Sequence, residues 1–258
     1  MDKMKKMKIK YILLIACLFF VSTIHAQDEK FEHRLVVGYN LGATSPLPLP
    51  AEVRSVETWH PLFTPQIGYE LRYALSDPTW KIGTGLQLDI KGMVVKDKVK
   101  YMYTRVSMNE EGEPSRTLSG YFVGKNKTKV LNSYLTLPVY VVKDINPKWN
   151  VRAGGYVAYA YSKKFNGNVS DGYMLPVDDE TNEVDLRTEI SHADFNFGED
   201  IRNFDFGVLA GTEMRLDPKM TVYGTLSWGL TSIFPSDYKP VSFKMYNIYL
   251  SLGITRKL

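Results

Sequence analysis

Cysteine is almost absent from the sequence: Cys17 is the only one in 258 residues. Because it lies within the first 26 residues, the rest of the chain has no thiol for a disulfide or for a thiolate metal site. A small secreted scaffold held together by disulfides is therefore excluded. Beyond residue 26 no run approaches the roughly 18 consecutive apolar residues of a membrane-spanning helix, which excludes a later transmembrane helix.

An excess of positive charge is missing too, once the N-terminus is set aside. Of the 32 basic and 28 acidic residues, five lysines and Asp2 lie in residues 1–26, which leaves 27 of each sign. A nearly neutral chain lacks the basic footprint of nucleic-acid binding, so we expect no nucleic-acid partner.

Catalytic and metal-binding motifs are also missing. The sequence has no G-x-S-x-G, no H-E-x-x-H and no pair of cysteines. Beyond residue 26, His33 begins a predicted strand, while His60 and His192 lie in separate predicted loops. We interpret both loop histidines as solvated polar groups. The acidic stretch from residue 178 does not have EF-hand spacing. We therefore predict no catalytic residues, no cofactor and no metal, and a protein that is not an enzyme.

The N-terminus has the features of an export signal. Five lysines precede an apolar run over residues 11–21, and a short segment then ends in the small residue Ala26. This pattern predicts a secretory signal peptide over residues 1–26, cleaved after Ala26. Residues 14–17 (LIAC) resemble a lipoprotein box, so lipidation at Cys17 stays open as an alternative.

What the sequence has in abundance is strict alternation of apolar with polar or small residues. In residues 132–162 this period of two fills two strands of about eleven residues joined by a tight turn, a length that suits a tilted membrane-crossing strand. The same pattern recurs along the chain. It predicts eight strands: residues 33–42, 65–75, one beginning at Trp80, two within 132–162, then 203–216, 220–231 and 243–255.

The predicted connections alternate between short and long. The short turns carry Asp77-Pro78, Asn146-Pro147 and Asp217-Pro218, which are favoured turn residues. Residues 43–64 and 165–202 are predicted to be long loops, and 93–129 to be a hairpin that extends two strands beyond the membrane. Short turns at one end and long loops at the other are typical of outer-membrane barrels. We predict an all-β, eight-stranded antiparallel up-and-down transmembrane barrel over residues 27–258, in the outer membrane.

An eight-stranded barrel is narrow, and side chains fill its interior. The faces predicted to point inward carry both signs of charge, which should pair in a structural network because unpaired buried charges are costly. This network comprises Arg34, Glu70, Arg72, Lys81, Asp89, Lys91, Arg152, Asp205, Glu213 and Arg215. An aromatic girdle at the membrane interfaces is predicted for Trp80, Trp149, Tyr159, Tyr161 and Trp228.

Five segments resemble the PorT-like outer-membrane β-barrel family of Gram-negative bacteria. They are residues 36–42 (VVGYNLG), 82–86 (IGTGL), 133–140 (SYLTLPVY), 203–211 (NFDFGVLAG) and 248–254 (IYLSLGI). The resemblance covers nearly all of the chain after residue 26, although Leu258 replaces the terminal Phe of many outer-membrane barrels. It implies an outer-membrane barrel, and its founding member serves type IX secretion. It implies no catalytic residues.

The functional expectation is thus a structural or interaction protein, an accessory of protein secretion or envelope assembly. Its expected partners are outer-membrane lipid, the barrel-assembly machinery during biogenesis, and an envelope or secretion-system protein contacted through loops 96–128 and 165–202. Two alternatives remain open: a small lipid-modifying barrel enzyme, and a soluble lipocalin-like barrel whose apolar strand faces point inward.

Overall fold

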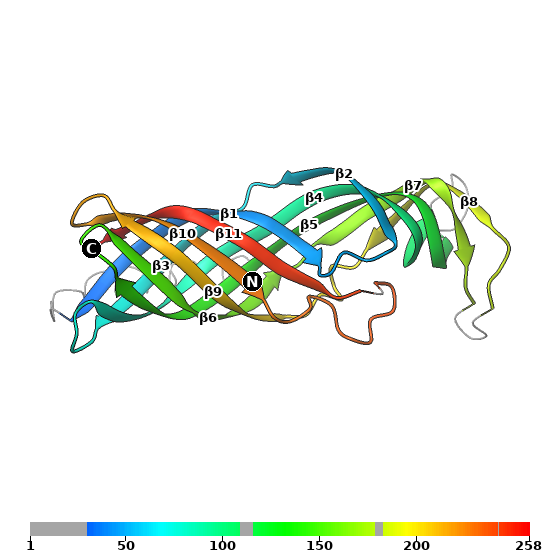
Figure 1. Cartoon of the computed structure of the whole chain (residues 1–258). Coiled ribbons are helices and arrows are strands. Elements are labelled where there is room, and N and C mark those ends of the chain that lie inside the picture. Colours follow the sequence, from blue (N-terminus) through cyan, green and yellow to red (C-terminus); the bar gives the residue numbers. More distant parts are fainter. Residues whose placement is uncertain (1–29, 109–115, 179–182, 242) are drawn as a thin grey trace, which may run out of the picture.

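The computed structural model describes residues 30–108, 116–178, 183–241 and 243–258. The predicted signal peptide and Cys17 lie outside these residues. Within them, no helix is both long and apolar enough to span a membrane. The described chain forms one antiparallel sheet (Figure 1) with these strands: β1 (Phe31–Pro46), β2 (Val53–Pro61), β3 (Pro65–Ala74), β4 (Trp80–Met108), β5 (Arg116–Asp144), β6 (Trp149–Ser162), β7 (Phe165–Pro176), β8 (Thr188–Asn196), β9 (Phe204–Arg215), β10 (Met220–Gly229) and β11 (Met245–Lys257).

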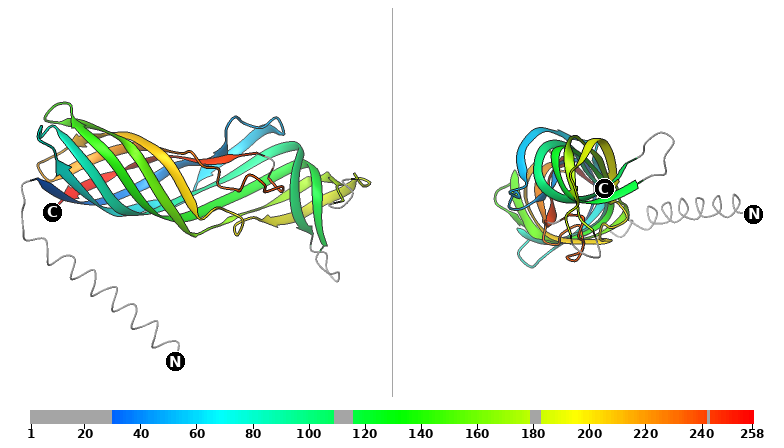
Figure 2. Two further views of the ribbon diagram at one scale, coloured as in Figure 1. Left: turned by 90° about the horizontal axis from the view of Figure 1, so that it is seen from below. Right: turned by 90° about the vertical axis from the view of Figure 1, so that its right-hand side faces the viewer.

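The predicted closed barrel is present. Strand pairings run β1–β3–β4–β5–β6–β9–β10–β11 and return from β11 to β1, so this cycle has no free edge. The strands wind around a common axis, and the C-terminus lies at the end opposite the projecting tips of β4 and β5 (Figures 1 and 2). Closure pairs the backbone groups around the wall, which a strand in lipid requires because no water is there to bind them.

Alternation places apolar residues outside the barrel and polar ones inside. On β5, Leu137 and Val139 are 46% and 52% exposed, whereas Tyr140 on the other face is 2% exposed. On β3, Ile67 points outward and Glu70 is fully buried. The soluble lipocalin-like alternative requires the opposite arrangement, and the structure contradicts it. An outward apolar band around a polar interior suits a wall surrounded by lipid.

The three short turns form as their residues predict. In each turn, the side-chain oxygen of the Asp or Asn before the proline accepts hydrogen bonds from backbone N–H groups two or three residues later in the chain. Thr79 donates to Asp77 at 2.9 Å, Trp149 donates to Asn146 at 2.9 Å, and Met220 donates to Asp217 at 2.8 Å. These turns lie at the barrel end that holds the C-terminus. They identify it as the periplasmic end, since outer-membrane barrels have their short turns there.

Two expectations about the opposite end are wrong. Residues 165–202 do not form a long loop, because β7 and β8 occupy most of the segment. Residues 43–64 also include a strand, β2, which pairs only with β4 and starts after the prolines. Both regions become strands because β4 and β5 run 29 residues each and offer pairing edges far beyond the barrel. The hairpin extension of these two strands was predicted.

The projecting parts of β4, β5, β7 and β8, with β2 alongside, are called the extension from here on. It bends back on itself at irregular pairings: Tyr101 has φ 57° where β4 shifts register, and Gly124 has φ 156° where β5 does. Bulges increase twist and bend a strand. The bend lets β8 pair with β4 through Ser107 and Asp194. Inside it is an apolar core that includes Val106, Leu118, Phe122, Val169, Met174 and Ile190.

Candidate functional site

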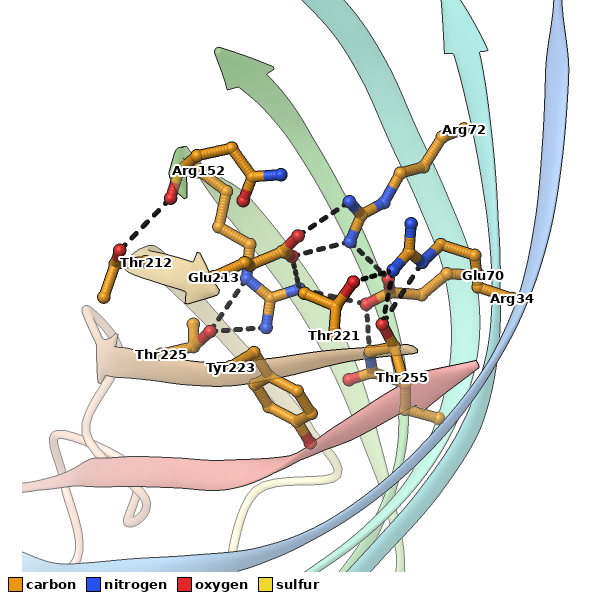
Figure 3. Close-up of polar contacts among 12 residues, drawn as sticks. Arg34, Glu70, Arg72, Arg152, Thr212, Glu213, Thr221, Tyr223, Thr225 and Thr255 are labelled. Carbon is orange, nitrogen blue, oxygen red and sulfur yellow. Dashed lines mark hydrogen bonds and ion pairs between the residues drawn. The ribbon is translucent and has the colours of Figure 1, made fainter. Parts of the chain in front are cut away.

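Four charged side chains meet in the middle of the barrel lumen (Figure 3). The Arg72 guanidinium donates two parallel bonds to Glu213, from Nη1 to Oε2 at 2.8 Å and from Nη2 to Oε1 at 2.6 Å. Its Nη2 also donates to Glu70 at 3.0 Å, and Arg152 Nη1 donates to Glu70 at 3.1 Å. Two cations and two anions thus balance. Such bidentate, charge-assisted bonds are the strongest kind available to this group of side chains.

Neutral groups complete the shell around these charges. Thr225 Oγ1 accepts from Arg152 Nε at 2.8 Å, and Gln87 donates to Glu70 at 3.2 Å. The Tyr140 ring lies 5.6 Å from the Arg72 guanidinium and 5.3 Å from that of Arg152. Tyr223 lies on another side of Arg152, at 4.9 Å. Guanidinium groups stack well on aromatic faces, so these rings hold the cations in place as well as filling space.

A second charged layer lies toward the periplasmic end. Arg34 pairs with Glu32 at 3.3 Å and donates to Thr221 and Thr255 at 2.6 and 2.7 Å. Lys81 lies between two carboxylates, 3.2 Å from Asp144 and 3.5 Å from Glu32. Sequence reasoning missed Glu32 and Asp144. The available signal was their spacing, since Glu32 precedes Arg34 by two residues and Asp144 follows Val142 by two, which places each on an inward face.

A third layer lies toward the extension. Lys91 Nζ is 3.8 Å from Asp205 and within 6 Å of the ring centres of Tyr134, Tyr156 and Tyr249. Asp205 accepts bonds from the Tyr156 hydroxyl at 3.1 Å and from Asn247 at 3.0 Å. Asp89 accepts from Gln66 at 2.6 Å. Lys91 is therefore surrounded by aromatic faces with one close carboxylate.

The lumen between these layers is filled. The cavity that Glu70, Asp89 and Lys91 share has a volume of about 40 Å³, which is room for one or two water molecules. Continuous conduction needs a connected aqueous path. A space of this size in the middle of the barrel is too small to be such a path.

The structure brings nine of the ten predicted network residues into the lumen, in three layers. Arg215 is the exception. It is the last residue of β9, its side chain is 41% exposed, and its guanidinium donates to the backbone carbonyl of Pro147 at 3.0 Å. The barrel opens to solvent at this level, and the guanidinium also lies 4.0 Å from Asp144 Oδ2. Arg215 therefore joins the periplasmic layer at its exposed rim and is not buried in the lumen like the other nine.

The predicted girdle residues all lie on the outside of the wall. Trp80 and Trp149 follow short turns at the periplasmic end, and Lys143 Nζ sits 4.7 Å over the Trp80 ring. Tyr159 contacts Phe204 at 5.3 Å between ring centres, and Tyr161 and Trp228 are similarly exposed. Their exposed positions are those that an interfacial role requires.

The two faces of the strands exchange their polarity where the barrel meets the extension. Along β4 the buried residues are polar up to Lys91, and from Met93 most are apolar. The exposed residues change in the opposite sense, from Leu86 and Leu88 to Lys96, Lys98 and Lys100. On β5, Lys125, Lys127 and Lys129 lie outside, followed by Leu135, Leu137 and Val139. Charged outside and apolar inside is the pattern of a protein in water, so the extension begins where the membrane ends.

The histidines do not converge on a catalytic arrangement. His33 contacts the Tyr69 hydroxyl, and His60 lies exposed on β2. His192 Nε2 is 3.2 Å from Asp194 Oδ1, and both side chains are more than half exposed. Across the described ranges, no group of three or more His, Cys, Asp and Glu side chains is placed to hold a metal ion.

A closed wall with an outward apolar band, a charged filled interior and a polarity change at one end defines an integral β-barrel of the outer membrane. Comparison with known families agrees. Residues 25–235 match the outer membrane protein beta-barrel domain, and the chain belongs to this family. The finer resemblance to PorT-like proteins is not part of that match.

Solved structures with similar architecture include Ail, the attachment invasion locus protein of Yersinia pestis, seen in complex with the heparin analogue sucrose octasulfate. It is 10% identical, with a TM-score of 0.35, over 89% of this chain and 99% of Ail. The outer membrane protease OmpT from Escherichia coli is 11% identical, with a TM-score of 0.30, over 89% of this chain and 94% of OmpT. No curated protein matches the chain significantly in sequence.

Proposed function

We propose that this outer-membrane barrel is a non-enzymatic, non-conducting interaction protein, and that the extension is the part that meets its partner. The finer role we propose is that of an accessory of protein secretion or envelope assembly, as the resemblance to PorT-like proteins implies. The filled lumen supports a barrel that anchors rather than transports. The length of β4 and β5, which carry the wall far beyond the apolar band, supports a rigid platform for contact.

The observation that carries the proposal is a row of lysines on the outer face of the extension. Lys96 on β4 is directly opposite Lys127 on β5, and Lys98 is opposite Lys125. Like charges directly opposite on one face of a sheet destabilise it. Glu57 pairs with Lys98 at 3.0 Å and Asp171 with Lys125 at 2.9 Å, but no carboxylate of the described residues pairs with Lys96 or Lys127.

A partner with an acidic surface would remove this repulsion, because its carboxylates would supply the missing opposite charges. Complementary charge also speeds association and selects among partners. The row lies within the 96–128 segment through which we expect a protein partner. The partner we propose is therefore an envelope or secretion-system protein with an acidic face.

The test compares two triple variants of equal charge change. Lys96→Gln/Lys127→Gln/Lys129→Gln removes the charge of the two lysines of the row without a paired carboxylate and of the neighbouring Lys129. Lys30→Gln/Lys148→Gln/Lys219→Gln neutralises exposed lysines at the periplasmic end. A photo-crosslinking amino acid is placed at position 58 of the parent chain and of both variants, because this position is opposite Lys96 in the sheet. After illumination of the cells, we expect the first variant to lose its crosslinked protein partner and the second to keep it.

Three results would each contradict a part of the proposal. A deletion strain whose secreted proteins and envelope composition equal those of the parent would remove the secretion and assembly role. Steady open channels in planar bilayers would contradict a non-conducting barrel. Binding to lipopolysaccharide vesicles by the parent chain, lost in the first variant without any protein crosslink, would replace the protein partner with an anionic lipid.

A further inference from the structure

The extension contains an apolar cavity of about 280 Å³, separate from the lumen network. It is bounded by the end of β1, by β2, β4, β5, β7 and β8, and by the start of β11 with the residues just before it. Its wall is mostly apolar, and Trp59, Met93, Met102, Phe195, Phe197 and Met245 are among its residues. Methionine side chains adapt to ligands of different shape. This cavity is well above the roughly 150 Å³ of an engineered apolar cavity that binds benzene.

One charged residue lies in this mostly apolar wall. Asp97 on β4 is only 8% exposed, and none of the lysines and arginines that the structure describes forms an ion pair with it. Its single side-chain bond comes from Asn126 Nδ2 at 2.8 Å. Burial raises the pKa of the Asp97 carboxyl above its ordinary value, and the nearby Glu57 carboxylate acts in the same direction. A buried carboxylate without a cation is costly, and the described residues supply none to Asp97.

Asn126 beside it is 7% exposed and has a free acceptor in the same place. Its amide nitrogen donates both to Asp97 and to Thr128 Oγ1, the latter at 3.1 Å, so both of its N–H groups are used. Its carbonyl oxygen Oδ1 is buried and has no hydrogen-bond partner. Asp97 and Asn126 both line the cavity, so two neighbouring acceptors, one of them anionic, lie in its wall, and no further side chain of the described residues donates to either.

The complement of two acceptors is a group that only donates. An ammonium carries three N–H donors, no acceptor and a positive charge. By comparison with benzene in the engineered cavity, about twice the volume accommodates roughly a dozen non-hydrogen atoms. The size, the apolar wall and the polar base together specify the ligand class.

We propose that the extension binds a small apolar amine, with its hydrocarbon body in the cavity and its ammonium group bound by Asp97 and Asn126. This goes beyond the proposed function, because it concerns the interior of the extension rather than its lysine-bearing outer face. It would stand if the secretion role failed.

The experiment uses the mature chain in nanodiscs of zwitterionic lipid and three probes that differ only at the head: 4-phenylbutylamine, 4-phenylbutanol and 4-phenylbutyrate. Binding is measured by titration calorimetry, with empty nanodiscs subtracted to remove partition into lipid. We expect the amine to bind about ten- to a hundredfold more tightly than the alcohol, the range typical of hydrogen bonds to charged groups. The carboxylate should bind most weakly because its charge repeats that of Asp97.

Two variants and a control locate the site. Asp97→Asn keeps the side-chain shape and should bring the affinity for the amine down to that for the alcohol. Val56→Trp places an indole in the cavity wall at a half-exposed position and should abolish binding of all three probes. Asp171→Asn removes another carboxylate of the extension, outside the cavity and 63% exposed, at a φ of 50° that Asn adopts readily. It should change nothing.

Each variant is first checked for heat-modifiable mobility in SDS, which reports an intact barrel. The proposal is overturned if the parent chain binds the amine and the carboxylate equally. It is also overturned if Asp97→Asn keeps the preference for the amine, or if Val56→Trp binds all three probes as the parent chain does. The lysine variants of the outer face should leave these affinities unchanged, which separates failure of this proposal from failure of the proposed function.

Discussion

Removing the positive charge of Arg72 tests whether the lumen network holds the barrel together. The Arg72 guanidinium is 1% exposed and makes two bonds to Glu213 and one to Glu70. Substitution by Met, which has a similar volume, leaves two buried carboxylates with Arg152 as their only close cation. Breaking a buried ion pair by removing one partner costs about 3–5 kcal/mol, because the remaining charge stays buried without compensation.

The assay is equilibrium unfolding in urea of the protein folded into lipid vesicles, followed by mobility in SDS without heating. With a urea dependence of about 2 kcal/mol per molar, a loss of that size moves the midpoint down by roughly 1.5–2.5 M. Arg215→Met is the matched control. Its guanidinium lies at the rim, 41% exposed, so we expect no more than about 1 kcal/mol.

A double variant checks the cause. Arg72→Met/Glu213→Gln removes one charge of each sign and leaves Glu70 paired with Arg152 at 3.1 Å. We expect it to recover most of the stability that the single variant loses. The reasoning is refuted if the free energy of unfolding of Arg72→Met is within about 1 kcal/mol of that of the parent chain. It is also refuted if the double variant is less stable than the single variant by as much as the single variant is less stable than the parent chain.

Three further predictions concern the wall, the extension and the histidines. Leu137→Arg, at an outward position in the apolar band, should lower the free energy of unfolding in vesicles by about 2–4 kcal/mol, whereas Leu186→Arg, at a position 89% exposed in the extension, should change it by less than about 0.5 kcal/mol; equal effects would contradict the membrane assignment. A carboxyl whose pKa is raised by folding keeps its proton to higher pH when folded, so Asp97 makes the extension most stable in acid and less stable as pH rises through the interval between the unfolded and folded pKa values. Hydrogen exchange in β4 and β5 should show this decline in the parent chain and a smaller one in Asp97→Asn; identical pH profiles would refute it. Mass spectrometry should show the same lipid A and phospholipids in cells that express His60→Gln or His192→Gln as in cells that express the parent chain. A changed lipid in either variant would support the enzyme alternative.

The sequence indicates where the extension begins, because the apolar and polar faces of the strand are exchanged there while the period of two stays the same. The strand continues through residues 91–96 without a break, and the polarity of its two faces changes there. The pattern of strands alone therefore gives one long strand. Comparing which of its two faces is apolar, before and after residue 92, would have located the membrane boundary between Lys91 and Met93. The lysines at alternate positions from 96 to 100 and from 125 to 129 were visible in the same way.

The sequence by itself determined the compartment class, the barrel wall and which side chains face the lumen, because strand alternation and turn residues are local properties of the chain. Only the tertiary structure decided which charges pair. Arg72 and Glu213 are 141 residues apart and meet across the lumen, and no local spacing specifies such a contact. The same holds for β2, β7 and β8, which exist because the long edges of β4 and β5 offer backbone partners. It holds equally for the cavity at Asp97, whose wall is assembled from strands and loops far apart in the sequence, from Ala43 to Met245.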